Sequence, residues 1–176
     1  MWLLSATVAH LQRWDRSLSL HLNQALRYVG IRPLLQAVSW LGNGIIWYAL
    51  MLSLLTRYGV EAALPVLHMA FVGAVGAAAY AMVKRTTSRP RPYQALERIA
   101  AGARALDAFS FPSGHTLHAV AFTLVACSYY PALEALLFPF VLLTAVSRVV
   151  LGLHYPSDVL AGAALGALIA AASFRI

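Results

Sequence analysis

Two long stretches without a charged residue constrain this chain more than any other feature. Residues 34–56 and residues 62–83 contain no Asp, Glu, Lys or Arg. A helix rises about 1.5 Å per residue and the hydrocarbon core of a bilayer is about 30 Å thick, so about 20 apolar residues span it. Both stretches reach that length, and we predict that each crosses a membrane.

Three shorter stretches are predicted to cross as well. Residues 116–133 and 159–174 carry no charge, and residues 132–147 carry a single acidic residue near one end. In the last crossing, Gly162 and Gly166 have the small-xxx-small spacing that lets helices approach closely, although a flexible Gly/Ala run would look the same. Only 11% of the 176 residues are charged, against about 25% in soluble domains. The sequence therefore predicts an all-α integral membrane helical bundle with about five transmembrane helices.

The N-terminal stretch, residues 7–28, has a different character. Apolar residues mix there with Arg13, Asp15 and Arg16, and Trp14 suits a membrane–water interface. We interpret this stretch as an amphipathic interfacial helix, with a poorly hydrophobic sixth crossing as the alternative. The whole chain, residues 1–176, is then a single membrane-embedded domain.

Five crossings place the remaining polar residues at one membrane face. The segment after the second crossing lies on this face, the third crossing leaves from it, the fourth returns to it and the fifth leaves again. The residues brought together in this way are Lys84, Arg91, Ser113, His115, Arg148, His154 and Asp158. Their convergence is the basis for predicting a site.

Each cluster also has a plain explanation of its own. The basic run at residues 84–91 is typical of a topology anchor. Ser113 suits a helix N-cap, Arg148 suits snorkelling to the interface, and Asp158 suits the first turn of a helix. These explanations do not account for three clusters meeting on one face. Phosphoryl transfer does, because it needs fixed cations, a nucleophile and a proton donor for the leaving oxygen.

The three clusters resemble the three signature motifs of the type 2 phosphatidic acid phosphatase (PAP2) superfamily, which also includes the vanadium haloperoxidases. All three motifs are complete and in order within residues 84–158. They read Lys84, six residues, Arg91-Pro92; then Pro112-Ser113-Gly114-His115; then Ser147-Arg148, five residues, His154, three residues, Asp158. In size and hydropathy the chain resembles the small bacterial integral membrane lipid phosphatases of this superfamily.

The resemblance implies a role for each matching residue. His154 would be the nucleophile that forms a phosphohistidine, Asp158 would orient and polarise it, and His115 would protonate the departing lipid oxygen. The phosphoryl oxygens would be held by Lys84, Arg91, Ser113, Gly114 and Arg148. The resemblance implies no metal and no cofactor, in agreement with Asp158 being the only carboxylate within the motifs.

The implied substrate is a lipid phosphomonoester or diphosphate, of the undecaprenyl diphosphate, phosphatidate or phosphatidylglycerol phosphate class. The chain carries a net charge of +7, but its basic residues lie between apolar runs, where lipid head groups are the available anions. We therefore expect membrane lipids and the lipid phosphate as partners, with no nucleic acid and no obligatory protein partner.

Three other functions fit part of the sequence pattern. A lipid phosphotransferase would use the same intermediate, and the motifs do not separate it from a hydrolase. A non-enzymatic lipid transporter would place charges within its helices, whereas these charges gather at helix ends. The vanadium haloperoxidases are larger, soluble proteins, whereas this chain is predicted to have membrane-spanning helices.

Two observations predict opposite orientations of the chain in the membrane. The resemblance implies a bacterial inner-membrane protein with its site on the periplasmic or outer side. The positive-inside rule favours the opposite, because of the 13 Lys and Arg residues only Arg57 and Arg175 fall on the other face. We favour the outward-facing site on the resemblance alone.

Overall fold

The computed structural model describes residues 2–176, with side chains from residue 7 onward. Over this range the chain is helical without any strand, so the all-α prediction is confirmed. The α-helices are α1 (Trp2–Asn23), α2 (Ile31–Trp40), α3 (Ile46–Tyr58), α4 (Ala63–Thr87), α5 (Pro92–Ala95), α6 (Gly114–Tyr129), α7 (Glu134–Val150) and α8 (Pro156–Ser173).

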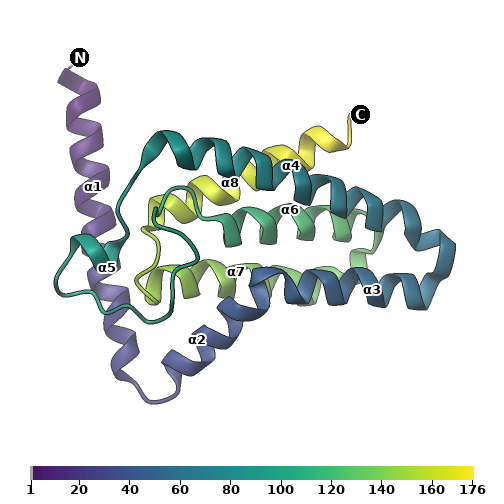
Figure 1. The fold of residues 1–176 in the computed structure, drawn as a ribbon, viewed down its shortest axis with the longest axis horizontal. Helices are drawn as coiled ribbons and strands as arrows, with labels where there is room; N and C mark the ends of the chain where they lie inside the picture. The colour runs from purple at the N-terminus through teal and green to yellow at the C-terminus, as the bar shows by residue number, and fades with distance from the viewer. Residues whose placement is uncertain (1) are drawn as a thin grey trace.

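The bundle runs along the long axis of the molecule (Figure 1). Helices α3, α4, α6, α7 and α8 follow this axis, and central α6 packs against α4, α7 and α8. Among the described residues, three helical stretches are long and apolar enough to cross a membrane: Ile31–Ala95, which turns back on itself between α3 and α4, Pro131–Val150 and Pro156–Ser173. The chain is therefore a membrane protein, and α6 is an apolar, shorter helix enclosed by the others.

Helices α6 and α8 touch through their backbones. A Cβ atom added at Gly162 would lie 2.4 Å from the Ser113 carbonyl oxygen, and one at Gly166 would lie 2.3 Å from that of Leu117. Any side chain at either glycine would therefore force the two helices apart. This close contact confirms the prediction made from the small-xxx-small spacing.

The first predicted crossing is not one continuous helix. A π-turn over Leu41–Ile45 separates α2 from α3, and Gly44 within it has a φ of 113°, a conformation that glycine adopts without strain. The predicted crossing over residues 34–56 lies within a candidate span, but apolar composition alone does not report this local break. The adjacent Asn43 lines a cavity described below.

Helix α1 runs across one end of the bundle (Figure 1). It turns a polar stripe towards the protein, because Asp15, Ser19 and Asn23 are buried, while Leu11 and Trp14 are exposed. A helix docked on a protein in water shows the reverse pattern. The exposed side mixes Leu11 and Trp14 with Arg13 and Arg16, which suits the boundary between lipid and water and agrees with an interfacial helix lying in the membrane surface.

The end of the bundle that α1 crosses holds the predicted site. Helices α4 and α7 end there, α6 and α8 begin there, and α5 and the loop of residues 96–113 lie over them (Figure 1). The apolar core fills the rest of the bundle, where Trp47 of α3 packs against Phe122 of α6 with ring centroids 5.3 Å apart. The rigid core thus fixes four helix ends relative to one another.

Candidate active site

His154 lies in the tight turn between α7 and α8 and is only 2% exposed. Gly152 in this turn has a φ of 71°, and a Cβ there would lie 2.8 Å from the Ala100 carbonyl oxygen. The His154 amide donates to the carbonyl of Arg148 at 3.1 Å. The turn therefore holds His154 at a fixed position beside the last turn of α7.

The hydrogen bond of one ring nitrogen fixes the tautomer of His154. Its Nδ1 lies 2.6 Å from the carbonyl oxygen of Ser110. A carbonyl only accepts, so Nδ1 carries the proton and Nε2 of the neutral ring keeps its lone pair. Nε2 lies 3.3 Å from Nη1 of Arg91. The nitrogen that can act as a nucleophile therefore faces the cations.

The surroundings of His154 keep the ring neutral. Burial lowers its pKa well below the ordinary value of 6.5, and the positive charges of Arg148, Arg91 and Lys84 lower the pKa further. An imidazole that is unprotonated at neutral pH is available to attack phosphorus.

Asp158 lies behind His154 but does not hydrogen-bond it directly. Its Oδ2 is 3.8 Å from Nδ1 of the ring. That oxygen accepts the Tyr155 amide at 2.8 Å, and Oδ1 accepts Nη1 of Arg89 at 2.6 Å. The carboxylate thus supports a positive charge on His154 through space, while Ser110 sets the ring orientation.

Lys84 and Arg91 approach the site from the end of α4 and the start of α5. Both are buried, and both pair with the Asp107 carboxylate, whose Oδ1 lies 2.6 Å from Lys84 Nζ and 2.8 Å from Arg91 Nη2. Burial alone would raise the pKa of Asp107, but hydrogen bonds from Lys84 and Tyr80 and the nearby cations outweigh it and hold this pKa at about 2. Arg91 Nη1 also donates to the Leu153 carbonyl at 2.7 Å, next to His154.

Arg148 is the third cation and is held differently. It is 3% exposed, its Nη1 donates to the hydroxyl of Ser39, and its Nε has no hydrogen-bond partner. Among the described residues no carboxylate forms an ion pair with it. A buried guanidinium with an open donor is suited to an anionic ligand.

The second motif forms the first turn of α6. The amide of Ser113 donates to the Asp158 carbonyl at 3.0 Å, and its buried hydroxyl bonds with Thr116 at 3.0 Å, so this residue joins α6 to α8. Gly114 packs under Tyr80, whose ring would lie 2.8 Å from an added Cβ. Amides in the first turn of a helix have no intrahelical partner, which makes the Gly114 end a donor site for an anion.

His115 faces a cavity of about 560 Å³ between α3, α4 and α6. The cavity reaches from the π-turn to the middle of the bundle and is lined mainly by apolar and small residues, among them Trp47, Met51, Ala74 and Phe122. His118, one turn further along α6, lines it too, but its Nδ1 lies 2.9 Å from the Gly114 carbonyl oxygen and its Nε2 lies 3.3 Å from that of Gly73, so its ring is engaged by the backbone. His115 is therefore the histidine placed between the cavity and the cations.

The structure adds residues that the sequence did not single out. Tyr80 donates to Asp107 and accepts from Lys84 Nζ at 2.6 Å. Arg89 lies between two buried carboxylates, Asp158 and Asp15 of α1. The available signal for Asp15 was that it is the single acidic residue of the mixed stretch 7–28, and a buried charge is expected to be paired.

The fold and the site together define a helical membrane protein with a buried histidine among three cations. The profile of the PAP2 superfamily matches residues 65–176. This match covers more than half of the chain and includes every residue predicted for the site, and the chain belongs to the PAP2 superfamily.

The chain is similar in sequence to a bacterial phosphatase. Decaprenylphosphoryl-5-phosphoribose phosphatase of Mycobacterium tuberculosis, found in two strains, is 38% identical over 92 residues, which cover 51% of this chain and 49% of the relative. The chain thus spans about half the length of the curated relatives it matches.

Two solved structures have a similar fold. LpxE of Aquifex aeolicus superposes with a TM-score of 0.78 at 25% identity, covering 91% of this chain and 94% of that one. A transmembrane PAP2 type phosphatidylglycerolphosphate phosphatase from Bacillus subtilis superposes with a TM-score of 0.69 at 20% identity, covering 99% and 96%. The second likeness bears on the fold alone.

Proposed function

We propose that this protein is a membrane lipid phosphatase that hydrolyses a lipid phosphomonoester or diphosphate through a phosphohistidine on His154. The observation that carries the proposal is the environment of this ring: Nδ1 is fixed on a carbonyl, and Nε2 faces the cations. Arg148, buried beside it without a carboxylate partner, supplies the open donor for the anion.

The reaction has two steps. In the first, Nε2 of His154 attacks phosphorus, the bond from phosphorus to the lipid oxygen breaks, and that oxygen takes a proton from His115, which enters the step as the imidazolium that the bound anionic phosphoryl group stabilises. In the second, a water attacks the phosphohistidine and gives a proton to His115. The phosphorus–nitrogen bond then breaks, inorganic phosphate leaves and both histidines return to their starting states.

Fixed charges stabilise the phosphoryl group in both steps. Lys84, Arg91 and Arg148 neutralise the oxygens, and the amide end of α6 at Gly114 adds donors. Asp158 stabilises the positive charge that develops on His154. Because protein cations supply the charge neutralisation, we expect the reaction to need no metal ion.

The cavity beside His115 suits the lipid chain. It is mostly apolar, it lies between helices that face the bilayer, and one end of it reaches the first turn of α6. An acyl or isoprenyl tail in this cavity would bring a phosphoryl group to the cations. The undecaprenyl diphosphate class is our first choice of substrate, with the phosphatidate and phosphatidylglycerol phosphate classes as the others to test.

We further propose that the site faces the outer side of a bacterial inner membrane. Several of the positive residues at this face are engaged within the protein, since Arg89 pairs with two carboxylates and Arg32 donates to the carbonyl of Gly102. These charges therefore serve the fold rather than insertion, which weakens the positive-inside argument. A reporter fused to the C-terminus is expected to be active only in the cytoplasm, and activity only outside it would contradict this orientation.

The function is tested by phosphate release from a panel of lipid phosphates and diphosphates in detergent with EDTA. Wild type is expected to release phosphate, His154→Ala is not, and the exposed His10→Ala variant should match wild type. Incorporation of labelled oxygen from water into the released phosphate separates hydrolysis from transfer to an acceptor lipid. Equal activity of His154→Ala and wild type would sink the proposal.

A further inference from the structure

A carboxylate already lies on two of the three cations of the site. Asp107 belongs to the loop of residues 96–113, and its Oδ1 contacts both Lys84 and Arg91. Its Oδ2 accepts the hydroxyl of Tyr80, and the amide of Phe109 donates to Oδ1 at 3.2 Å. The carboxylate is thus held at a defined place, on donors that a phosphoryl group would use.

Asp107 is nevertheless poised to leave. Its side chain is 32% exposed, whereas those of Lys84 and Arg91 are 9% and 1% exposed. The anion of this cluster therefore lies on a surface loop, and the cations are fixed in the protein. An incoming anion can replace the carboxylate without moving the cations.

The charges of the site set what can replace Asp107. A singly charged anion would gain from Lys84 and Arg91 only what the carboxylate already provides. A doubly charged phosphoryl group forms stronger charge-assisted hydrogen bonds and has a further oxygen for Arg148, whose Nε has no hydrogen-bond partner among the described residues. Dianions therefore compete with Asp107 better than monoanions do.

We propose that Asp107 is a specificity-determining residue that keeps phosphodiesters out of the phosphate site and gives way to doubly charged phosphoryl groups. The bulk phospholipids of a bilayer present singly charged phosphodiesters at the same depth as the substrate. Without a resident carboxylate, these head groups would occupy Lys84 and Arg91. The proposal rests on the proposed function, which assigns these two cations to phosphate.

The test compares the binding of inorganic phosphate and dimethyl phosphate to the detergent-solubilised protein at pH 8 by calorimetry. Wild type is expected to prefer inorganic phosphate. Asp107→Asn, which keeps the shape of the side chain, is expected to bind dimethyl phosphate about tenfold more tightly than wild type, because one charge-assisted bond no longer opposes binding. The gain for dimethyl phosphate should exceed the gain for inorganic phosphate.

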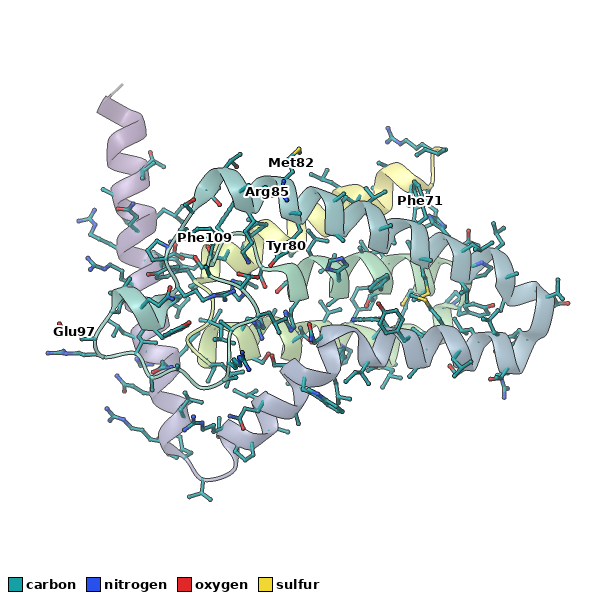
Figure 2. The ribbon with its side chains drawn as sticks, viewed as in Figure 1. Phe71, Tyr80, Met82, Arg85, Glu97 and Phe109 are labelled. Atoms are coloured by element: carbon teal, nitrogen blue, oxygen red, sulfur yellow. The ribbon has the colours of Figure 1, made fainter. Side chains whose placement is uncertain are left out.

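Two variants test whether Asp107 acts through its contacts with the two cations or only through its negative charge. Glu97→Gln removes a negative charge from the same loop at an exposed position, at the outer edge of the molecule away from Tyr80 (Figure 2). It is expected to leave both affinities unchanged. Tyr80→Phe keeps the charge of Asp107 but removes its hydrogen bond, and should shift both affinities in the direction of Asp107→Asn by a smaller factor.

Two outcomes would overturn the proposal. If Asp107→Asn weakens the binding of both anions or leaves their ratio unchanged, while Arg148→Met still abolishes phosphate binding, Asp107 only supports Lys84 and Arg91 and the proposed function stands. If wild type binds no phosphate and Arg148→Met changes nothing, the phosphate site fails together with the proposed function.

Discussion

Two charged clusters flank His154, and they differ in how their charges are balanced. In the rear cluster, a single cation is held between two buried carboxylates at 2.7 Å and 2.6 Å. Its members are Asp15, Arg89 and Asp158. Each charge there has a partner within the protein, and the cluster ties α1 to the first turn of α8.

The front cluster has more cations than anions. Its members are Lys84, Arg91, Arg148 and Asp107, and the one partly exposed carboxylate pairs with Lys84 and Arg91 only. A balanced cluster has no charge left for a ligand, whereas an excess of fixed cations leaves positive charge that can bind an anion. We therefore propose that the rear cluster supports a positive charge on His154 and that the front cluster binds the substrate.

The largest effect should come from the front cluster. Arg148→Met removes the cation that no internal carboxylate balances, and we expect kcat/KM for the lipid substrate to fall about 10³-fold, as when a transition-state donor is lost. Arg148→Lys should recover only part of this loss, because a lysine does not reproduce the planar fork of donors. Steady-state phosphate release in detergent measures both.

The matched control is Arg85→Met. Arg85 is an exposed cation in the last turn of α4, close to Met82 on the outer side of that helix (Figure 2). This variant is expected to keep the wild-type rate. A similar fall in both variants would mean that general surface charge, rather than the buried guanidinium, drives binding.

Substitutions in the rear cluster should lower the stability of the protein. Arg89→Met leaves Asp15 and Asp158 buried without their cation, and we expect the free energy of unfolding to fall by about 3 kcal/mol. Adding Asp15→Asn to this variant should recover part of the loss, because one unpaired charge is removed. Thermal unfolding in detergent measures the effect, and additive single-variant losses would contradict the coupling.

A smaller effect concerns the protonation of His154. Its pKa is lowered in the folded protein, so below the ordinary value of 6.5 the unfolded chain takes up a proton that the folded protein does not. Stability from this group is therefore complete above pH 6.5 and declines as the pH falls below it. His154→Gln should reduce that decline between pH 7 and pH 5.

The ring itself reports this protonation directly. In a histidine-labelled sample, the His154 resonance, assigned by its loss in His154→Gln, is expected to keep its neutral position as the pH falls through 6.5. A midpoint at or above 6.5 would mean that the front cations do not act on the ring.

The sequence was sufficient to predict the helices and the meeting of the motifs. Apolar length predicts the spans, and the alternation of crossings brings Lys84, His115 and Arg148 to one end of the bundle. Local patterns of this kind depend only on neighbouring residues, so a single chain reveals them.

Partners fixed by tertiary contacts were not predictable. Asp107 lies in a loop without periodicity, and only folding brings it against residues of α4 and α5. The carbonyl of Ser110, rather than Asp158, accepts the hydrogen bond from Nδ1 of His154, while the two oxygens of Asp158 accept from Tyr155 and Arg89. The inward polar stripe of α1 likewise follows from contacts with distant loops.

The central claim is that His154 carries the phosphoryl group, and detection of that group tests it most directly. Protein quenched in alkali during turnover, where phosphohistidine persists, is digested and examined by mass spectrometry. We predict a phosphoryl group on the peptide containing His154 in wild type and none in His154→Gln. A phosphoryl group on any other residue of the turning-over enzyme would contradict the account.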